Sequence, residues 1–161
     1  MTRAETLLQR AIATKAKIAT AESCTAGMIA AAITDVAGSS DIFDRGFVTY
    51  SNAAKMQMLG VLPSTLDAHG AVSEQVAGEM AAGALANSDA TIAVSVTGIA
   101  GPGGSEHKPE GRVCFGIAQD NSPLKTQTVE FGALGRAAVR QATTDYALDW
   151  LISELGDPGA S

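Results

Sequence analysis

Apolar residues recur along the chain at two alternating spacings, one typical of helices and one typical of strands. Leu7, Leu8, Ala11 and Ile12 share one helix face, which predicts a first helix over residues 4–15. The same reasoning predicts further helices over residues 25–33, 52–59, 73–86 and from 134 or 136 to about 155. The link between Pro63 and Gly70 is expected to be irregular or a short helix.

Short apolar and β-branched runs between these helices predict five strands, over residues 17–21, 44–50, 90–97, 113–119 and 125–131. The run 90–97 is almost entirely apolar or β-branched, which is typical of a strand covered on both faces. The last two strands flank a short turn, so we expect an antiparallel hairpin. Together the elements predict an α/β fold, a three-layer α/β/α sandwich with a mixed sheet.

Length and composition narrow the class of protein. The 161 residues suit one domain, 1–161, with a frayed tail at 156–161. Eleven basic against seventeen acidic residues give a formal net charge of −6, so we expect no nucleic-acid partner, while a small anionic substrate stays compatible. Two cysteines, Cys24 and Cys114, fit neither a disulfide framework nor a metal site. Without a signal peptide or a membrane-spanning run, the cytoplasm is the expected location.

Ser23 is the first candidate for chemistry, because it follows a predicted strand and precedes a predicted helix. The free N–H groups and the dipole of a helix N-terminus stabilise a developing oxyanion, which would suit a serine nucleophile. Alternatively, Ser23 only caps the helix. The neighbouring Cys24 could be a thiol nucleophile, although a small buried cysteine is the commoner case.

A serine nucleophile needs a base. The two histidines, His69 and His107, lie in a link and in a glycine-rich loop, and neither follows a recognisable strand end. Lys55 lies one turn into the helix that follows the second strand, and a partly desolvated lysine can act as a base. If both strands end at the same sheet edge, Ser23 and Lys55 converge. Alternatively, Lys55 is a solvated surface lysine.

A glycine-rich loop over residues 98–111 follows the buried strand. Its amides could cradle an anion, and ligands favour the carboxyl ends of strands, although a flexible surface turn is the alternative. The loop does not end in Gly-Lys-Ser/Thr, which excludes a P-loop kinase. Arg136 and Arg140 share a face of the last helix and could bind a phosphate or simply face solvent.

Four motifs together resemble a known family. They are Thr-Ala-Glu-Ser-Cys-Thr-Ala-Gly at 20–27, Gly-Phe-Val-Thr-Tyr-Ser-Asn-Ala-Ala-Lys at 46–55, Gly-Ala-Val-Ser at 70–73 and Gly-Ile-Ala-Gly-Pro at 98–102. In this order they resemble the CinA C-terminal domain family, whose members include stand-alone nicotinamide-nucleotide amidases. The family commonly has a glycine where this chain has Ala26, which we interpret as a better helix former. The glycine-rich loop is one residue shorter than in many members.

The resemblance implies an α/β/α fold, hydrolysis of nicotinamide mononucleotide to nicotinate mononucleotide and ammonia, no metal or cofactor, and a possible homodimer. It implies that Ser23 is the nucleophile and Lys55 the base, and that Tyr50 and Ser40 relay or orient the proton. It implies that Thr25 at the helix start contributes to substrate binding. It also implies that the loop amides from Gly98 to Gly104 hold the phosphate together with Arg140 or Lys108. The other substrate-binding residues that it implies are Thr97, Gly98, Gly101, Gly103, Arg140 and Gln141.

Three other functions stay open at this point. The chain could bind a pyridine nucleotide without catalysis, and it would then release no ammonia. It could be a competence-associated partner protein, although its acidic balance argues against direct DNA contact. It could also be a hydrolase that uses Cys24, which thiol alkylation would distinguish.

Overall fold

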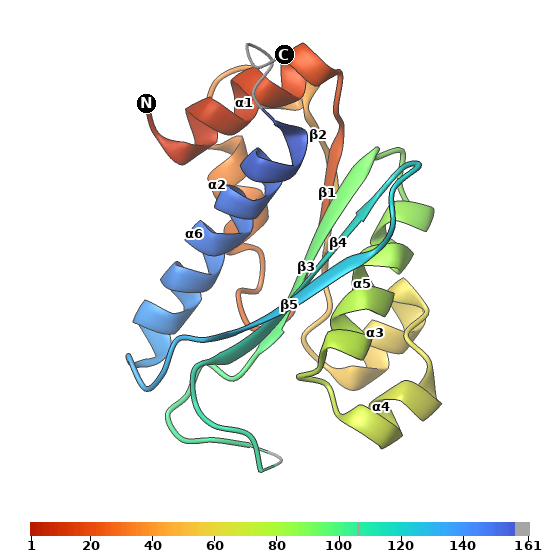
Figure 1. Cartoon of the computed structure of the whole chain (residues 1–161), viewed down its shortest axis with the longest axis vertical. Helices are drawn as coiled ribbons and strands as arrows, with labels where there is room; N and C mark the ends of the chain where they lie inside the picture. The colour runs from red at the N-terminus through yellow and green to blue at the C-terminus, as the bar shows by residue number, and fades with distance from the viewer. Residues whose placement is uncertain (106, 157–161) are drawn as a thin grey trace.

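The computed structural model describes residues 1–105 and 107–156, which form one five-stranded sheet covered by helices on both faces (Figure 1). The strands lie in the order β2-β1-β3-β4-β5. Strands β2, β1 and β3 are mutually parallel, and β4 is antiparallel to both β3 and β5. The strands are β1 (Ile18–Glu22), β2 (Phe43–Val48), β3 (Ile92–Gly98), β4 (Arg112–Gln119) and β5 (Lys125–Glu130).

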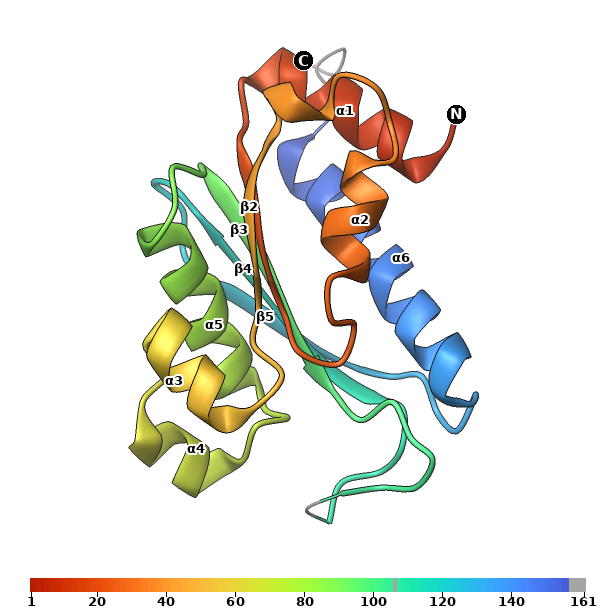
Figure 2. The same cartoon turned by 180° about the vertical axis from the view of Figure 1, so that it is seen from behind.

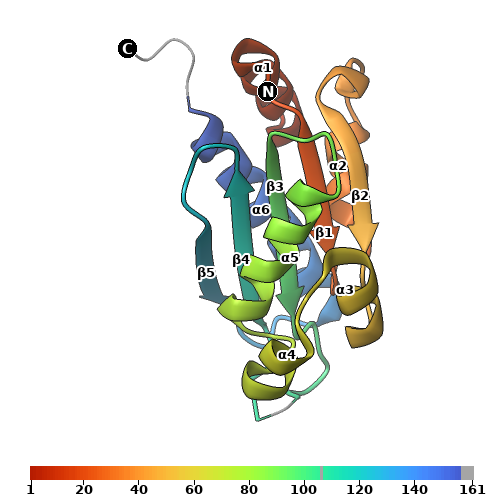
Figure 3. The ribbon, with the colours of Figure 1, turned by 90° about the vertical axis from the view of Figure 1, so that its right-hand side faces the viewer.

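Helices α1 (Arg3–Thr14), α2 (Met28–Thr34) and α6 (Arg136–Leu155) cover one face of the sheet. Helices α3 (Asn52–Leu59), α4 (Pro63–His69) and α5 (Glu74–Ala86) cover the other, as Figures 2 and 3 show from behind and from the side. A short 3₁₀ turn, Ser39–Asp41, precedes β2. The predicted three-layer α/β/α sandwich with a mixed sheet is confirmed.

Side chains of β1 alternate between the two helical layers, as a strand requires. Ile18 joins the core beneath α1, α2 and α6, while Ala19 and Ala21 join the core beneath α3 and α5. Continuing this alternation sends Glu22 toward α2 and Ser23 toward α3. Two consecutive residues at the end of one strand therefore serve opposite faces of the sheet.

The predicted helices and strands agree with the structure to within a few residues, with one exception that matters for the site. Helix α2 begins at Met28 and not near Thr25, because Ala26 and Gly27 both have positive φ angles, of 48° and 104°. The interpretation of Ala26 as a helix former is therefore wrong. It occupies a left-handed conformation in a turn, which costs an alanine more than the glycine that the family commonly has there.

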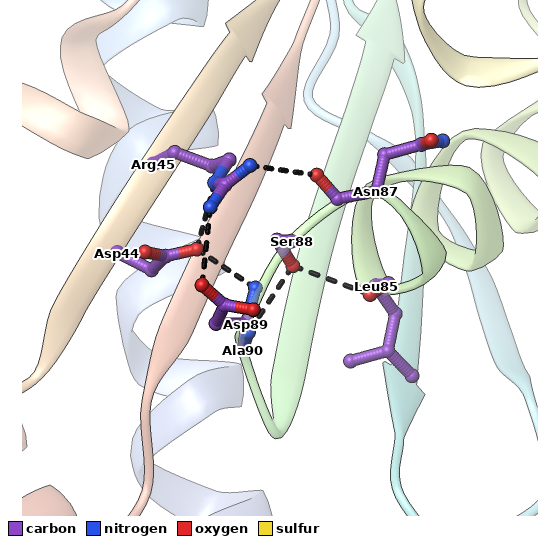
Figure 4. Close-up of polar contacts among 7 residues, drawn as sticks. All are labelled: Asp44, Arg45, Leu85, Asn87, Ser88, Asp89 and Ala90. Atoms are coloured by element: carbon purple, nitrogen blue, oxygen red, sulfur yellow. Dashed lines mark hydrogen bonds and ion pairs between the residues drawn. The ribbon is translucent and has the colours of Figure 1, made fainter.

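The amino-terminal ends of the parallel strands are joined by a polar cluster (Figure 4). Asp44 accepts a hydrogen bond from the Asp89 N–H, which lowers the pKa of its carboxyl group. Arg45 contacts Asp44, the Asn87 carbonyl and Asp89 at 2.8, 3.1 and 3.3 Å. Strand β2 is thus tied near its start to the turn that leads into β3.

No helix in residues 1–105 and 107–156 is both long and apolar enough to cross a membrane.

The contact between α3 and α5 gives a prediction for Gly83. A Cβ atom at Gly83 would lie 1.9 Å from the Leu59 carbonyl oxygen, which is backbone and cannot rotate away. We expect Gly83→Ala to lower the free energy of unfolding by about 1–3 kcal/mol, although alanine favours a helix by about 1 kcal/mol. Urea unfolding measures this change.

The matched control is Gly78→Ala in the same helix, where the new Cβ would lie 3.0 Å from the exposed Leu124 side-chain tip and 3.3 Å from the Thr126 methyl group, and no backbone atom is as close. We expect this variant to be as stable as the parent or more stable. Equal effects of the two substitutions would contradict the packing argument.

Candidate active site

Ser23 lies in the turn that follows β1, and its backbone is held on both sides. The Ser23 N–H donates to the Val96 carbonyl of β3 at 3.1 Å, and the carbonyl of the preceding residue, Glu22, accepts from the Thr49 N–H at 2.9 Å. The residue is 8% exposed. The parallel strands β1, β2 and β3 therefore fix the position from which the Ser23 hydroxyl emerges.

Lys55 reaches this hydroxyl from the first turn of α3. Helix α3 begins after Ser51, whose hydroxyl accepts a hydrogen bond from the Ala54 N–H, as an N-cap does. Lys55 Nζ lies 2.9 Å from Ser23 Oγ, 3.0 Å from the Thr49 carbonyl and 3.2 Å from the Tyr50 carbonyl. The convergence of Ser23 and Lys55 at one sheet edge is thus observed.

Burial lowers the pKa of the Lys55 amine below its ordinary value of 10.5. The residue is 1% exposed, and within the described residues no carboxylate forms a salt bridge with it. A neutral amine has two N–H donors and one lone pair. Two carbonyls can take the donors, which leaves the lone pair facing the Ser23 hydroxyl.

The thiol of Cys24 has the opposite environment from the one a nucleophile needs. Burial raises its pKa to about 11, so the thiolate is scarce at neutral pH. Cys24 is 5% exposed. The structure therefore favours the serine over the thiol as nucleophile.

The turn after Ser23 offers backbone donors. The Ala26 N–H closes the turn on the Ser23 carbonyl at 3.1 Å, while the N–H groups of Cys24 and Thr25 make no backbone hydrogen bond within the described residues. Free N–H groups beside a nucleophile are the usual means of stabilising an oxyanion. These donors belong to the turn itself and not to the helix start that the sequence predicted.

A cavity of about 320 Å³ opens above Ser23 and Lys55. Its volume is in the range of small-molecule sites. The walls come from the ends of β2 and β3, the glycine-rich loop, the link between α4 and α5, and the start of α6. The lining residues are Ser23, Cys24, Tyr50, Asn52, Lys55, Ala71, Val72, Thr97 to Ser105 and Arg136.

The end of β3 brings Thr97 and Gly98 to the cavity, and the glycine-rich loop brings Gly101 and Gly103, all four of which the family resemblance placed near the substrate. Gly101 has a φ of 94°, and a Cβ there would lie 1.9 Å from the Glu110 carboxylate. Within the described residues, the N–H groups of Gly101, Gly103 and Gly104 make no backbone hydrogen bond. The loop can therefore offer several free amides to an anion.

Among the three cations considered as phosphate ligands, Arg136 lines the cavity, and Arg140 and Lys108 do not. Arg136 donates to the Gly101 carbonyl at 2.7 Å and to the Tyr50 hydroxyl at 2.9 Å. Arg140 and Lys108 lie outside the cavity lining and donate to backbone carbonyls. Arg136 and Arg140 are one helical turn apart, so sequence alone could not tell which of them faces the cavity.

Four other predicted site residues have different positions from those expected. Ser40 lies in the 3₁₀ turn at the amino ends of the strands, so it cannot relay a proton to Ser23. Gln141 donates to Asp145 and does not line the cavity. Thr25 is fully buried, and its hydroxyl donates to Glu22 at 2.6 Å. Tyr50 lines the cavity, but it contacts Lys55 through its carbonyl, while its hydroxyl accepts from Arg136.

Sequence reasoning missed three residues of the site and gave no role to Glu22. Asn52, Ala71 and Val72 line the cavity, and all three lie in motifs that were singled out, at 46–55 and 70–73, without being given a role. Neither His69 nor His107 lines it. In the part of the chain that the structure describes, no three His, Cys, Asp or Glu side chains lie together as metal ligands would.

Comparison with known proteins shows the family to which this chain belongs. Residues 1–155 match the family model described as the CinA C-terminal domain. The chain belongs to the CinA C-terminal domain family. Among its CinA-domain relatives, the nicotinamide-nucleotide amidohydrolase PncC of Escherichia coli K12 is 54% identical over 141 residues, which are 87% of this chain and 85% of that protein. PncC of Enterobacter agglomerans is 55% identical over 136 residues, 84% of this chain and 82% of that protein.

Solved structures of CinA-superfamily proteins share the fold. The competence/damage inducible protein CihA of Agrobacterium tumefaciens superposes with a TM-score of 0.88 at 48% identity, covering 98% of each chain. A competence or damage-inducible protein of Enterobacter asburiae gives 0.91 at 32% identity, covering 96% of each chain.

The buried amine of this CinA domain gives a prediction for stability. The folded pKa of Lys55 is lowered and the unfolded chain has the ordinary value of 10.5. Between these two pKa values the unfolded state binds more protons, so stability rises with pH. We expect the free energy of unfolding of the parent, minus that of Lys55→Met, to increase as pH rises toward 10.5.

Urea unfolding of both proteins over a series of pH values tests this, because groups shared by the two proteins cancel in the difference. A difference that does not change with pH would mean that Lys55 keeps its ordinary pKa in the folded chain.

Proposed function

We propose that this protein hydrolyses the carboxamide of nicotinamide mononucleotide to nicotinate mononucleotide and ammonia, with Ser23 as nucleophile and Lys55 as base. The observation that carries the proposal is the 2.9 Å contact between Lys55 Nζ and Ser23 Oγ at the floor of a cavity. The PncC relatives, at 54 to 55% identity over most of the chain, supply the substrate class.

In the first half of the reaction, the lone pair of Lys55 takes the proton of the Ser23 hydroxyl. Ser23 Oγ then bonds to the carboxamide carbon, and the carbonyl oxygen becomes an oxyanion. The N–H groups of Cys24 and Thr25 are the proposed donors to that oxyanion, each worth about 3 kcal/mol in such a role. The C–N bond breaks as the Lys55 ammonium returns its proton to the leaving nitrogen, and ammonia departs.

In the second half, water attacks the Ser23 ester. Lys55 removes a proton from the water as the new C–O bond forms, and the tetrahedral intermediate collapses. As it collapses, the bond between the acyl carbon and Ser23 Oγ breaks, and Lys55 gives its proton to Oγ. Nicotinate mononucleotide is then released. The Thr49 and Tyr50 carbonyls accept hydrogen bonds from Lys55 in both charge states, so the amine keeps its position through the cycle.

The substrate phosphate is proposed to lie against the free amides of the glycine-rich loop and the Arg136 guanidinium. Arg136 is exposed at the start of α6, and its present partners are a carbonyl and a phenol, both neutral. A phosphate would be a stronger acceptor for a guanidinium than either. Phosphate binding would therefore exchange these contacts for charge-assisted ones.

The first test is ammonia release from nicotinamide mononucleotide by the purified protein. We expect turnover by the parent and a loss of at least about a thousandfold in kcat for Ser23→Ala and for Lys55→Met, because the two side chains act as a unit. Ser40→Ala should turn over like the parent, since Ser40 lies at the other end of the strands. Binding of the mononucleotide without ammonia release by the parent would instead support a binding module.

The phosphate site has its own test in Arg136→Met. We expect this variant to raise KM for the mononucleotide by about tenfold or more, because one charge-assisted contact is worth roughly 1.5–3 kcal/mol. KM for the riboside, which has no phosphate, should stay unchanged. An equal rise for both substrates would place the phosphate elsewhere.

A further inference from the structure

The carboxylate of Glu22 accepts three hydrogen bonds, all from groups of this chain beside the turn that carries Ser23. It accepts from the Thr25 hydroxyl at 2.6 Å, the Ile29 N–H at 2.8 Å and the Ala30 N–H at 3.1 Å. Glu22 is 1% exposed and does not line the cavity. Gly27, which precedes α2, has no side chain to cap the helix, so Glu22 satisfies those N–H groups from a distance.

Arg140 holds the same turn from α6. Its Nε donates to the Cys24 carbonyl at 3.0 Å, and one terminal nitrogen donates to the Thr25 carbonyl at 3.3 Å. The guanidinium presents these donors in a fixed fork, so it fixes two adjacent peptide planes relative to each other. Arg140 therefore holds the turn through the Cys24 and Thr25 carbonyls, and Glu22 holds it through the Thr25 hydroxyl.

Both contacts lie on the face of the sheet away from Lys55. Glu22 and Ser23 are consecutive residues, so the strand alternation sends their side chains to opposite faces. Helices α2 and α6 both pack on the face that Glu22 serves. The turn is thus held from the layer of α2 and α6, while the Ser23 hydroxyl contacts Lys55 in the layer of α3.

We propose that Glu22 and Arg140 are positioning residues that fix the Ser23 hydroxyl and the Cys24 and Thr25 N–H groups for attack on the substrate carbonyl. A carbonyl and the following N–H belong to one rigid plane. Fixing the Cys24 carbonyl therefore also fixes the direction of the Thr25 N–H. The left-handed Ala26 makes outside support more important, because its conformation disfavours the turn.

The test compares Glu22→Gln and Arg140→Lys with matched substitutions elsewhere. Gln keeps one acceptor oxygen but places an NH₂ donor beside N–H donors. Lys keeps the charge and loses the fork. The control for Glu22 is Glu79→Gln, because Glu79 likewise accepts from a backbone N–H and a threonine, Leu62 and Thr65. The control for Arg140 is Arg10→Lys, since Arg10 donates to the Ile152 carbonyl far from the cavity.

The main measurement is the rate at which a fluorophosphonate probe labels Ser23, followed by intact-protein mass. It needs only a reactive Ser23, whereas kcat for the mononucleotide also rests on the proposed function. If Ser23 of the parent is labelled but the mononucleotide is not hydrolysed, the proposed substrate is wrong. The labelling rates of the variants then still decide whether Glu22 and Arg140 position Ser23. A parent whose Ser23 is not labelled would overturn it, because no reactive hydroxyl would need positioning.

We expect Glu22→Gln and Arg140→Lys each to slow labelling and lower kcat by about tenfold to a hundredfold, as misplacing a reacting group does. KM should stay unchanged, and the pH midpoint of the labelling rate should stay that of the parent because Lys55 is untouched. Both controls should label at the parental rate. A raised KM for Arg140→Lys would make Arg140 a substrate ligand and overturn its positioning role.

If circular dichroism shows that Glu22→Gln does not fold, the labelling rate of Arg140→Lys decides the proposal, because that substitution removes no buried acceptor. A folded Arg140→Lys that labels at the parental rate would overturn the proposal.

Discussion

A buried amine surrounded by neutral oxygen atoms is the constraint around which this structure is organised. Lys55 meets a hydroxyl and two carbonyls, and no carboxylate in the described residues forms a salt bridge with it. Desolvation then disfavours the ammonium form. The two residues that follow β2, Thr49 and Tyr50, supply those carbonyls, and α3 supplies the lysine one turn after its N-cap. Without the sheet edge, the same lysine would be an ordinary solvated cation.

Much of this arrangement follows from the sequence, because it depends on periodicity and on where strands end. The carboxyl ends of parallel strands meet at one edge, so Ser23 after β1 and Lys55 after β2 could be brought together by reasoning alone. The glycine-rich loop after β3 follows by the same rule. The hairpin of β4 and β5 follows from two β-branched runs around a short turn.

The parts that sequence reasoning missed depend on contacts whose direction has no local pattern. Glu22 caps a helix whose first N–H partner lies seven residues away, whereas sequence rules look for a cap beside the helix. Arg136 and Arg140 are equivalent by spacing, and only the packing of α6 decides which reaches the cavity. Ser40 was assigned from the family resemblance alone, although the 3₁₀ turn that contains it precedes β2 and so lies at the other end of the sheet from Ser23.

The division of labour between Glu22 and Ser23 also bears on how the protein can be inhibited or redesigned. A small molecule in the cavity reaches Ser23 but has no access to Glu22, which faces the opposite helical layer. Substitutions around Glu22 and Arg140, neither of which lines the cavity, could therefore change how the turn holds Ser23 while the lining of the cavity stays the same. The residues that hold the turn and most of the residues that line the cavity are therefore different residues, and the two sets can vary independently.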